Sequence, residues 1–91
     1  MTNSYQVIHT PKFDKQLAKL DKSVSKHIVH WMKNHLDKTT NPHISGHALK
    51  GKLSGLWRYR IGDYRVIAQI EHNKLIILCL KVGHRRDIYQ D

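Results

Sequence analysis

Acidic residues are scarce in this chain. Among its 91 residues, Asp and Glu number 7 against 16 Lys and Arg, which gives a formal net charge of +9 with the eight His counted as neutral. Such a balance is typical of a protein that meets phosphate or an acidic protein, because neutralising phosphates releases condensed counterions and favours binding. The charge alone predicts a class of partner and no sequence specificity.

Cysteine and long apolar runs are also scarce. Cys79 is the single cysteine and lies in an apolar run over 75–80, so it forms no intrachain disulfide and is expected to fill space in a buried strand. No segment approaches the roughly 18 apolar residues that span a membrane, and residues 1–6 lack the pattern of a signal peptide. We expect a cytoplasmic protein with no membrane partner.

The length bounds the architecture. Ninety-one residues predict one domain, 1–91, with a single core and no enclosed cofactor site, so no cofactor is expected. The pairs His27 with His30 and His43 with His47 have spacings that could hold a metal on a helix. No cysteine pair or carboxylate cluster accompanies them, so we expect no metal.

Apolar spacing predicts the first half of the fold. A short strand over 5–9 ends at Thr10, which can cap a helix over 11–20 that begins with Pro11. A second apolar stripe at helical spacing predicts a helix over 23–37, and the two helices are expected to form a hairpin. Residues 39–46 are rich in turn formers and predict a loop.

Three strand patterns fill the second half, over 56–61, 64–71 and 74–82. The third is apolar on both faces and is therefore expected inside the sheet. The sequence predicts an α+β fold: an N-terminal strand, a helix hairpin and a three-stranded meander, with helices on one face of a mostly antiparallel sheet.

Arginines share one face of this meander. The Gly62-Asp63 pair predicts a two-residue hairpin turn, which places Ile61 opposite Tyr64 and Arg60 opposite Arg65. Alternation along the strand adds Arg58 to the same face. Like charges opposed on a sheet destabilise it by about 0.2–1 kcal/mol per pair, so the arrangement indicates a polyanion or acidic partner. Trp57, Tyr59 and Tyr64 would point to the opposite face and into the core.

Two series of residues carry a resemblance to a known family. The first runs from Pro42 to Arg65 and contains Gly46-His-Ala-Leu-Lys-Gly-Lys-Leu and Trp57-Arg-Tyr-Arg-Ile-Gly-Asp-Tyr-Arg65. The second is Lys81-Val-Gly-His-Arg-Arg-Asp-Ile-Tyr89. Together with 15–21 they closely resemble the RelE-type toxins of type II toxin–antitoxin modules, over nearly the whole chain.

The resemblance implies an activity and partners. It implies an endoribonuclease that cleaves mRNA in the ribosomal A site and thereby inhibits translation, with no metal, by attack of the 2′-hydroxyl on the neighbouring phosphate. It also implies a cognate antitoxin protein that neutralises the toxin. Operator DNA would be contacted only through the toxin–antitoxin complex.

Family positions suggest roles for individual side chains. Arg65 and Arg85 match arginines of the family, and we expect them to stabilise the charge of the transition state because a planar guanidinium matches phosphate oxygens bidentately. Tyr89 matches a tyrosine that in relatives stacks on the base or assists proton transfer. Arg58 and Arg60 stand where some relatives place lysines. The expected phosphate-binding residues are Arg58, Arg60, Lys50, Lys52 and Arg86.

The general base is the point at which this chain departs from those relatives. Arginine holds its proton too tightly to accept another one readily. His47, just before Leu49-Lys50-Gly51, is one candidate base. His84 is the competing candidate, as base or as the acid for the leaving group.

Two other functions share this fold and stay open at this point. One is a gyrase-inhibiting toxin of the ParE type, which does no chemistry on RNA. The other is a non-catalytic co-repressor whose basic face binds only its antitoxin or operator DNA.

Overall fold

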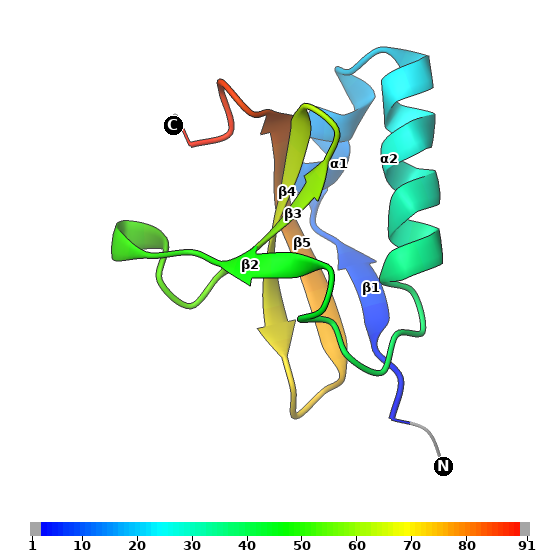
Figure 1. Ribbon diagram of the computed structural model, residues 1–91. Helices are drawn as coiled ribbons and strands as arrows, with labels where there is room; N and C mark the ends of the chain where they lie inside the picture. The colour runs from blue at the N-terminus through cyan, green and yellow to red at the C-terminus, as the bar shows by residue number, and fades with distance from the viewer. Residues whose placement is uncertain (1–2, 90–91) are drawn as a thin grey trace.

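A five-stranded sheet with two helices on one face makes up the structure, a computed structural model that describes residues 3–89 (Figure 1). In chain order the elements are β1 (Gln6–His9), α1 (Pro11–Ala18), α2 (Lys22–His35), β2 (Gly46–Ala48), the short 3₁₀ helix η1 (Gly51–Leu53), β3 (Trp57–Ile61), β4 (Tyr64–Glu71) and β5 (Ile76–His84). The sheet order is β1-β5-β4-β3-β2, and only the β1–β5 pair is parallel. The predicted α+β class is confirmed.

Helix α1 begins and ends for local reasons. The Thr10 hydroxyl accepts a hydrogen bond from the Phe13 backbone N–H at 3.2 Å and donates one to the Cys79 carbonyl at 2.8 Å, so the cap also ties the helix to β5. The helix ends at Ala18, two residues before the predicted end, because the N–H groups of Lys19 and Leu20 bond three residues back in a tighter turn.

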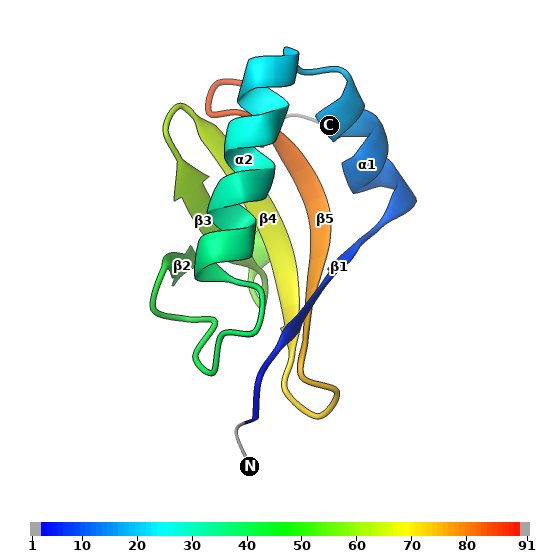
Figure 2. The same ribbon diagram turned by 90° about the vertical axis from the view of Figure 1, so that its right-hand side faces the viewer.

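Helix α2 buries the predicted stripe. Ile28, Met32 and Leu36 are buried, and Val24 and Trp31 pack against the same core. The helix spans Lys22–His35 rather than 23–37, with Leu36 as its C-terminal cap. In Figure 2, α2 lies across the sheet while α1 lies beside β5.

The β3–β4 hairpin has the predicted register. Ile61 pairs with Tyr64 and Arg60 with Arg65, and Gly62 adopts a φ of 60° in the turn between them. Tyr59 is fully buried on the helix side and donates a hydrogen bond to the Pro42 carbonyl at 2.6 Å. Burial, with a smaller contribution from Cys79, raises the pKa of Tyr59.

Strand β2 was missed by the sequence analysis, which predicted loop up to Gly46. Gly46–Ala48 pairs antiparallel with β3, with Gly46 opposite Tyr59 and Ala48 opposite Trp57. A Cβ on Gly46 would lie 2.6 Å from the Arg58 carbonyl oxygen and 2.5 Å from Trp57 Nε1. Only glycine therefore lets this segment approach β3 closely enough to pair with it.

Strand β5 also differs at its ends from the predicted strand over 74–82. The turn before it extends to Leu75, which has a φ of 55°, and the strand continues through Gly83 to His84. β5 lies between β1 and β4, as its apolar sequence predicted. Beyond the end of β1, the Gln16 side chain of α1 accepts a hydrogen bond from the Val82 N–H at 2.9 Å and covers the open strand edge.

Within residues 3–89, neither helix has the length and apolar character that a membrane-spanning helix needs.

We expect Gly46→Ala to destabilise the fold by about 1–3 kcal/mol, the usual range for an overpacked site, because the added methyl group meets backbone of β3. Urea unfolding measures the change. Gly83→Ala is the control, since a Cβ there lies 3.5 Å from the nearest atom, an ordinary contact. Equal stability of the two variants would contradict the close approach of β2.

We expect the Cys79 thiol to resist modification in the folded protein. The side chain is fully buried, and burial, followed by the charge of Asp14, raises the pKa of Cys79 to about 12. The reactive thiolate is therefore rare at mildly alkaline pH. Titration with a disulfide reagent should give slow reaction in buffer and rapid reaction in guanidinium; rapid reaction in buffer would contradict the burial.

Candidate functional site

The sheet face that points away from the helices carries three arginines. Arg58 and Arg60 alternate along β3, and Arg65 pairs with Arg60 from β4. We call this surface, defined by Arg58, Arg60 and Arg65, the arginine face. The η1 loop and the C-terminal segment both project from this side of the sheet (Figure 1). Two projecting segments therefore flank the charged surface.

Arg65 is the most buried of these arginines, with 9% of its surface exposed. Its Nη1 donates to the Gly62 carbonyl at 2.9 Å and to the Tyr64 carbonyl at 2.8 Å, so the guanidinium closes the hairpin turn. Burial and then the charges of Arg60 and Arg58 lower the pKa of Arg65. The hydrogen bonds to the turn carbonyls offset part of the desolvation cost of the Arg65 guanidinium. They also fix its positive charge beneath the arginine face.

His47 joins the arginine face through β2. It lies directly opposite Arg58 in the β2–β3 register and is exposed. Facing residues on antiparallel strands have Cβ atoms about 5 Å apart. The His47 and Arg58 side chains therefore start from neighbouring positions on the same face, and the imidazole is exposed to solvent.

Tyr89 reaches the same place from the end of the chain. Its hydroxyl accepts a hydrogen bond from Arg58 Nη1 at 3.3 Å, and 46% of its surface is exposed. Arg58 Nε is buried and has no hydrogen-bond acceptor among the described residues. Arg58 thus lies opposite His47 in the sheet and donates to Tyr89, while its Nε makes no hydrogen bond within the described residues.

Backbone bonds and one apolar anchor place Tyr89. The N–H groups of Asp87 and Ile88 both donate to the His84 carbonyl, at 2.9 and 3.0 Å, and form a tight turn after β5. Ile88 is 3% exposed and lies against Gly83, which pairs with Arg65. The turn therefore folds back over the arginine face.

The same turn brings in the two remaining predicted arginines. The Arg85 N–H donates to the Asp63 carbonyl at 2.7 Å, and Arg85 Nε lies 3.8 Å from the Asp63 carboxylate. Arg86 is exposed. Arg85 is thereby joined to the β3–β4 turn, beside the backbone that Arg65 binds.

His84, the competing candidate base, lies on the other side of the sheet. It pairs with Tyr64, and their rings make an edge contact with centroids 5.4 Å apart. Tyr64 itself borders a hollow with Ile28 of α2. His84 Nδ1 accepts a hydrogen bond from the Arg86 N–H at 3.2 Å. The structure brings His47 to the arginine face and does not bring His84 there.

Three lysines complete the surroundings. Lys50 and Lys52 are exposed, just before and within η1, whose loop projects on the side of the arginine face. Lys81 pairs with Ile67, the residue opposite Arg58, so it shares the arginine face; the sequence analysis did not name it as a site residue. Gly83 pairs with Arg65 and therefore lies on the arginine face. Alternation along the strand places Lys81, two positions earlier, on the same face.

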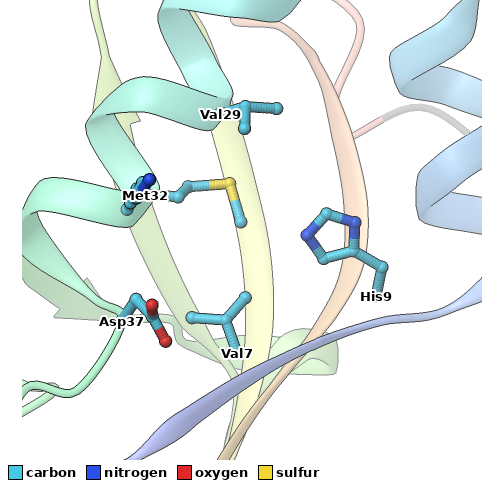
Figure 3. A pocket seen from close by; sticks show the side chains of 6 residues that line it. Val7, His9, Val29, Met32 and Asp37 are labelled. Carbon is cyan, nitrogen blue, oxygen red and sulfur yellow. The ribbon is translucent and has the colours of Figure 1, made fainter.

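One pocket lies away from the arginine face. It has a volume of about 200 Å³ between β1 and α2, and Figure 3 shows Val7, His9, Val29, Met32 and Asp37 around it, with Lys33 also lining it. Its imidazole, His9, binds the Asp14 carboxylate at 2.9 Å. None of the predicted site residues lines this pocket, so the candidate site is an open charged surface. Among residues 3–89, no three His, Cys, Asp or Glu side chains are grouped to hold a metal ion.

We expect Arg60→Glu to stabilise the folded protein by about 0.2–1 kcal/mol, because it replaces a facing pair of like charges with an opposite pair. Urea unfolding measures the difference. Lys26→Glu, on the exposed side of α2, makes the same change in net charge without facing Arg65. If both substitutions changed the free energy of unfolding equally, repulsion between Arg60 and Arg65 would not destabilise the sheet.

Several solved structures similar to this one are toxins or toxin–antitoxin complexes. The toxin–antitoxin complex RelBE2 from Mycobacterium tuberculosis contains a chain with a TM-score of 0.82 and 27% identity, covering 92% of this chain and 94% of that one. The archaeal RelE–RelB complex from Pyrococcus horikoshii gives 0.68 and 27%, covering 96% and 99%. The isolated E. coli RelE toxin gives 0.70 at 19% identity, covering 89% and 84%, a likeness of fold alone.

A family comparison covers almost the whole chain, although no curated protein sequence matches it. The profile of the ParE toxin of type II toxin-antitoxin system, parDE, matches residues 7–89. This span contains both helices, strands β2 to β5, all of β1 except Gln6, the arginine face and Tyr89. The chain therefore belongs to the ParE toxin family, within the RelE/ParE superfamily of toxin–antitoxin toxins.

Proposed function

We propose that this toxin is an endoribonuclease that cleaves mRNA in the ribosomal A site without a metal. One observation carries the proposal: β2 places His47 opposite Arg58, and the C-terminal turn brings the Tyr89 hydroxyl to the same guanidinium. A surface that only bound a polyanion would need the cations alone. An imidazole and a phenol on either side of one cation supply proton-transfer groups as well.

His47 is the proposed general base. It accepts the proton of the 2′-hydroxyl as O2′ forms a bond to the adjacent phosphorus and the bond from phosphorus to O5′ breaks. The products are a 2′,3′-cyclic phosphate and a 5′-hydroxyl, and the leaving O5′ takes up a proton. Exposure of His47 lets the RNA reach it, and Arg58 beside it can bind the phosphate under attack.

The arginines stabilise the charge that develops on the phosphorane. Arg58 and Arg60, which alternate along β3 on the arginine face, would contact phosphate oxygens. Arg65 contributes a fixed charge from below, because its Nη1 is held by the turn carbonyls. A charge that needs no reorganisation stabilises a transition state efficiently.

Arg85 acts with Arg65 on the charge of the phosphorane. Lys50, Lys52 and Arg86 extend the contact to neighbouring phosphates, and Tyr89, almost half exposed, stacks on a base or assists proton transfer. The similar chains from M. tuberculosis and P. horikoshii were solved in toxin–antitoxin complexes, which supports a cognate antitoxin protein as partner. The ribosome and mRNA are the proposed cytoplasmic targets, and operator DNA is contacted only through the toxin–antitoxin complex.

We expect brief expression of the wild-type chain to produce cuts within translated codons, mapped by primer extension. His47→Ala should reduce the cleavage rate about 10²–10⁴-fold, the usual contribution of a general acid or base. His27→Ala is the matched control, since His27 is an exposed histidine on α2, away from the arginine face. Loss of cleavage in His27→Ala, or full activity in His47→Ala, would contradict the assignment of the base.

The ParE name of the matching family supports one second candidate, inhibition of DNA gyrase. The same cells distinguish the two functions. Growth arrest without mRNA cuts, together with inhibited supercoiling by purified gyrase, would replace the endoribonuclease proposal. Cuts that carry 5′-hydroxyl ends would support the chemistry proposed for His47.

A further inference from the structure

Asp63 places a carboxylate at the edge of the arginine face. It occupies the second position of the β3–β4 turn, and its carboxylate oxygen lies 3.8 Å from Arg85 Nε. Its carbonyl separately accepts the Arg85 N–H at 2.7 Å. The backbone hydrogen bond fixes the position of the Arg85 main chain. The carboxylate attracts the Arg85 guanidinium and so affects its orientation.

The turn does not require an aspartate for its backbone. Gly62 carries the positive φ of the turn, and Asp63 is not among the residues with positive φ. An asparagine or another small polar residue could adopt the same conformation. The backbone conformation of the turn therefore does not explain why residue 63 carries a carboxylate.

Stability does not explain it either. The two side chains are 54% and 69% exposed, and exposed ion pairs contribute little to folding. For a surface that binds RNA, a negative charge at its edge weakens the attraction for phosphate. A group that adds little stability and opposes binding of the substrate is best explained by its effect on the orientation of Arg85.

We propose that Asp63 is a positioning residue, which holds the Arg85 guanidinium toward Arg65 for the cleavage reaction; this inference rests on the proposed endoribonuclease function. The Gly62-Asp63 turn would then organise both arginines. The Gly62 carbonyl binds Arg65 Nη1, and the Asp63 carboxylate orients Arg85 Nε. A hairpin turn would set the separation of two charges that act on one phosphate.

Asp63→Asn tests the proposal because it keeps the size of the side chain and removes its charge. We expect kcat for cleavage of ribosome-bound mRNA to fall about 10–100-fold, the effect of a misplaced group, while KM stays the same or falls. Asp87→Asn is the matched control, with the same charge change in the adjacent exposed turn. It should leave kcat unchanged, and Asp63→Glu should restore part of the lost rate.

A second measurement does not depend on activity. The Arg85 Nε–H signal in an NMR spectrum, assigned with Arg85→Lys, should shift in Asp63→Asn and stay in place in Asp87→Asn. An unmoved signal with unchanged kcat overturns the role of Asp63, and so does an equal loss of kcat in both asparagine variants. If the wild-type chain cleaves no RNA while the signal shifts, the proposed endoribonuclease function is wrong. The role of Asp63 in cleavage is then wrong too, and only its ion pair with Arg85 is confirmed.

Discussion

The register of the β3–β4 hairpin is the constraint on which the rest of this structure depends. The two-residue turn at Gly62 and Asp63 fixes the pairing of Arg60 with Arg65 and, with it, the face on which every residue of both strands lies. A slip by one residue would turn Tyr59 out of the core and an arginine into it. The fold and the candidate site are therefore specified by the same backbone pairing.

This register gives the sheet one apolar face that is buried and one face that carries positive charge. The helix side buries Phe13, Ile28, Tyr59 and their neighbours and supplies the stability of the fold. The arginine face opposes like charges and leaves a buried Arg58 Nε without an acceptor among the described residues. Such costs are typical of functional surfaces. A small core on one side thus supports an unfavourable arrangement on the other.

The site is completed by segments from outside the meander. β2 contributes His47, and the turn after β5 contributes Arg85 and Tyr89, with buried Ile88 as its anchor. The first of these segments depends on glycine, because Gly46 lets β2 approach β3. The proposed base and the proposed aromatic residue therefore come to Arg58 from opposite edges of the face.

Local signals in the sequence determined the helices, the hairpin turn and the three arginines on one face, because 3.6- and 2-residue periodicities and turn chemistry are properties of neighbouring residues. The tertiary structure alone decided the rest. A three-residue strand has too little periodicity to be recognised, so the pairing of His47 with Arg58 emerged only from β2 packing on β3. The positions of the two candidate histidines were decided likewise, since the strand carries His84 to the helix side, where it contacts Tyr64.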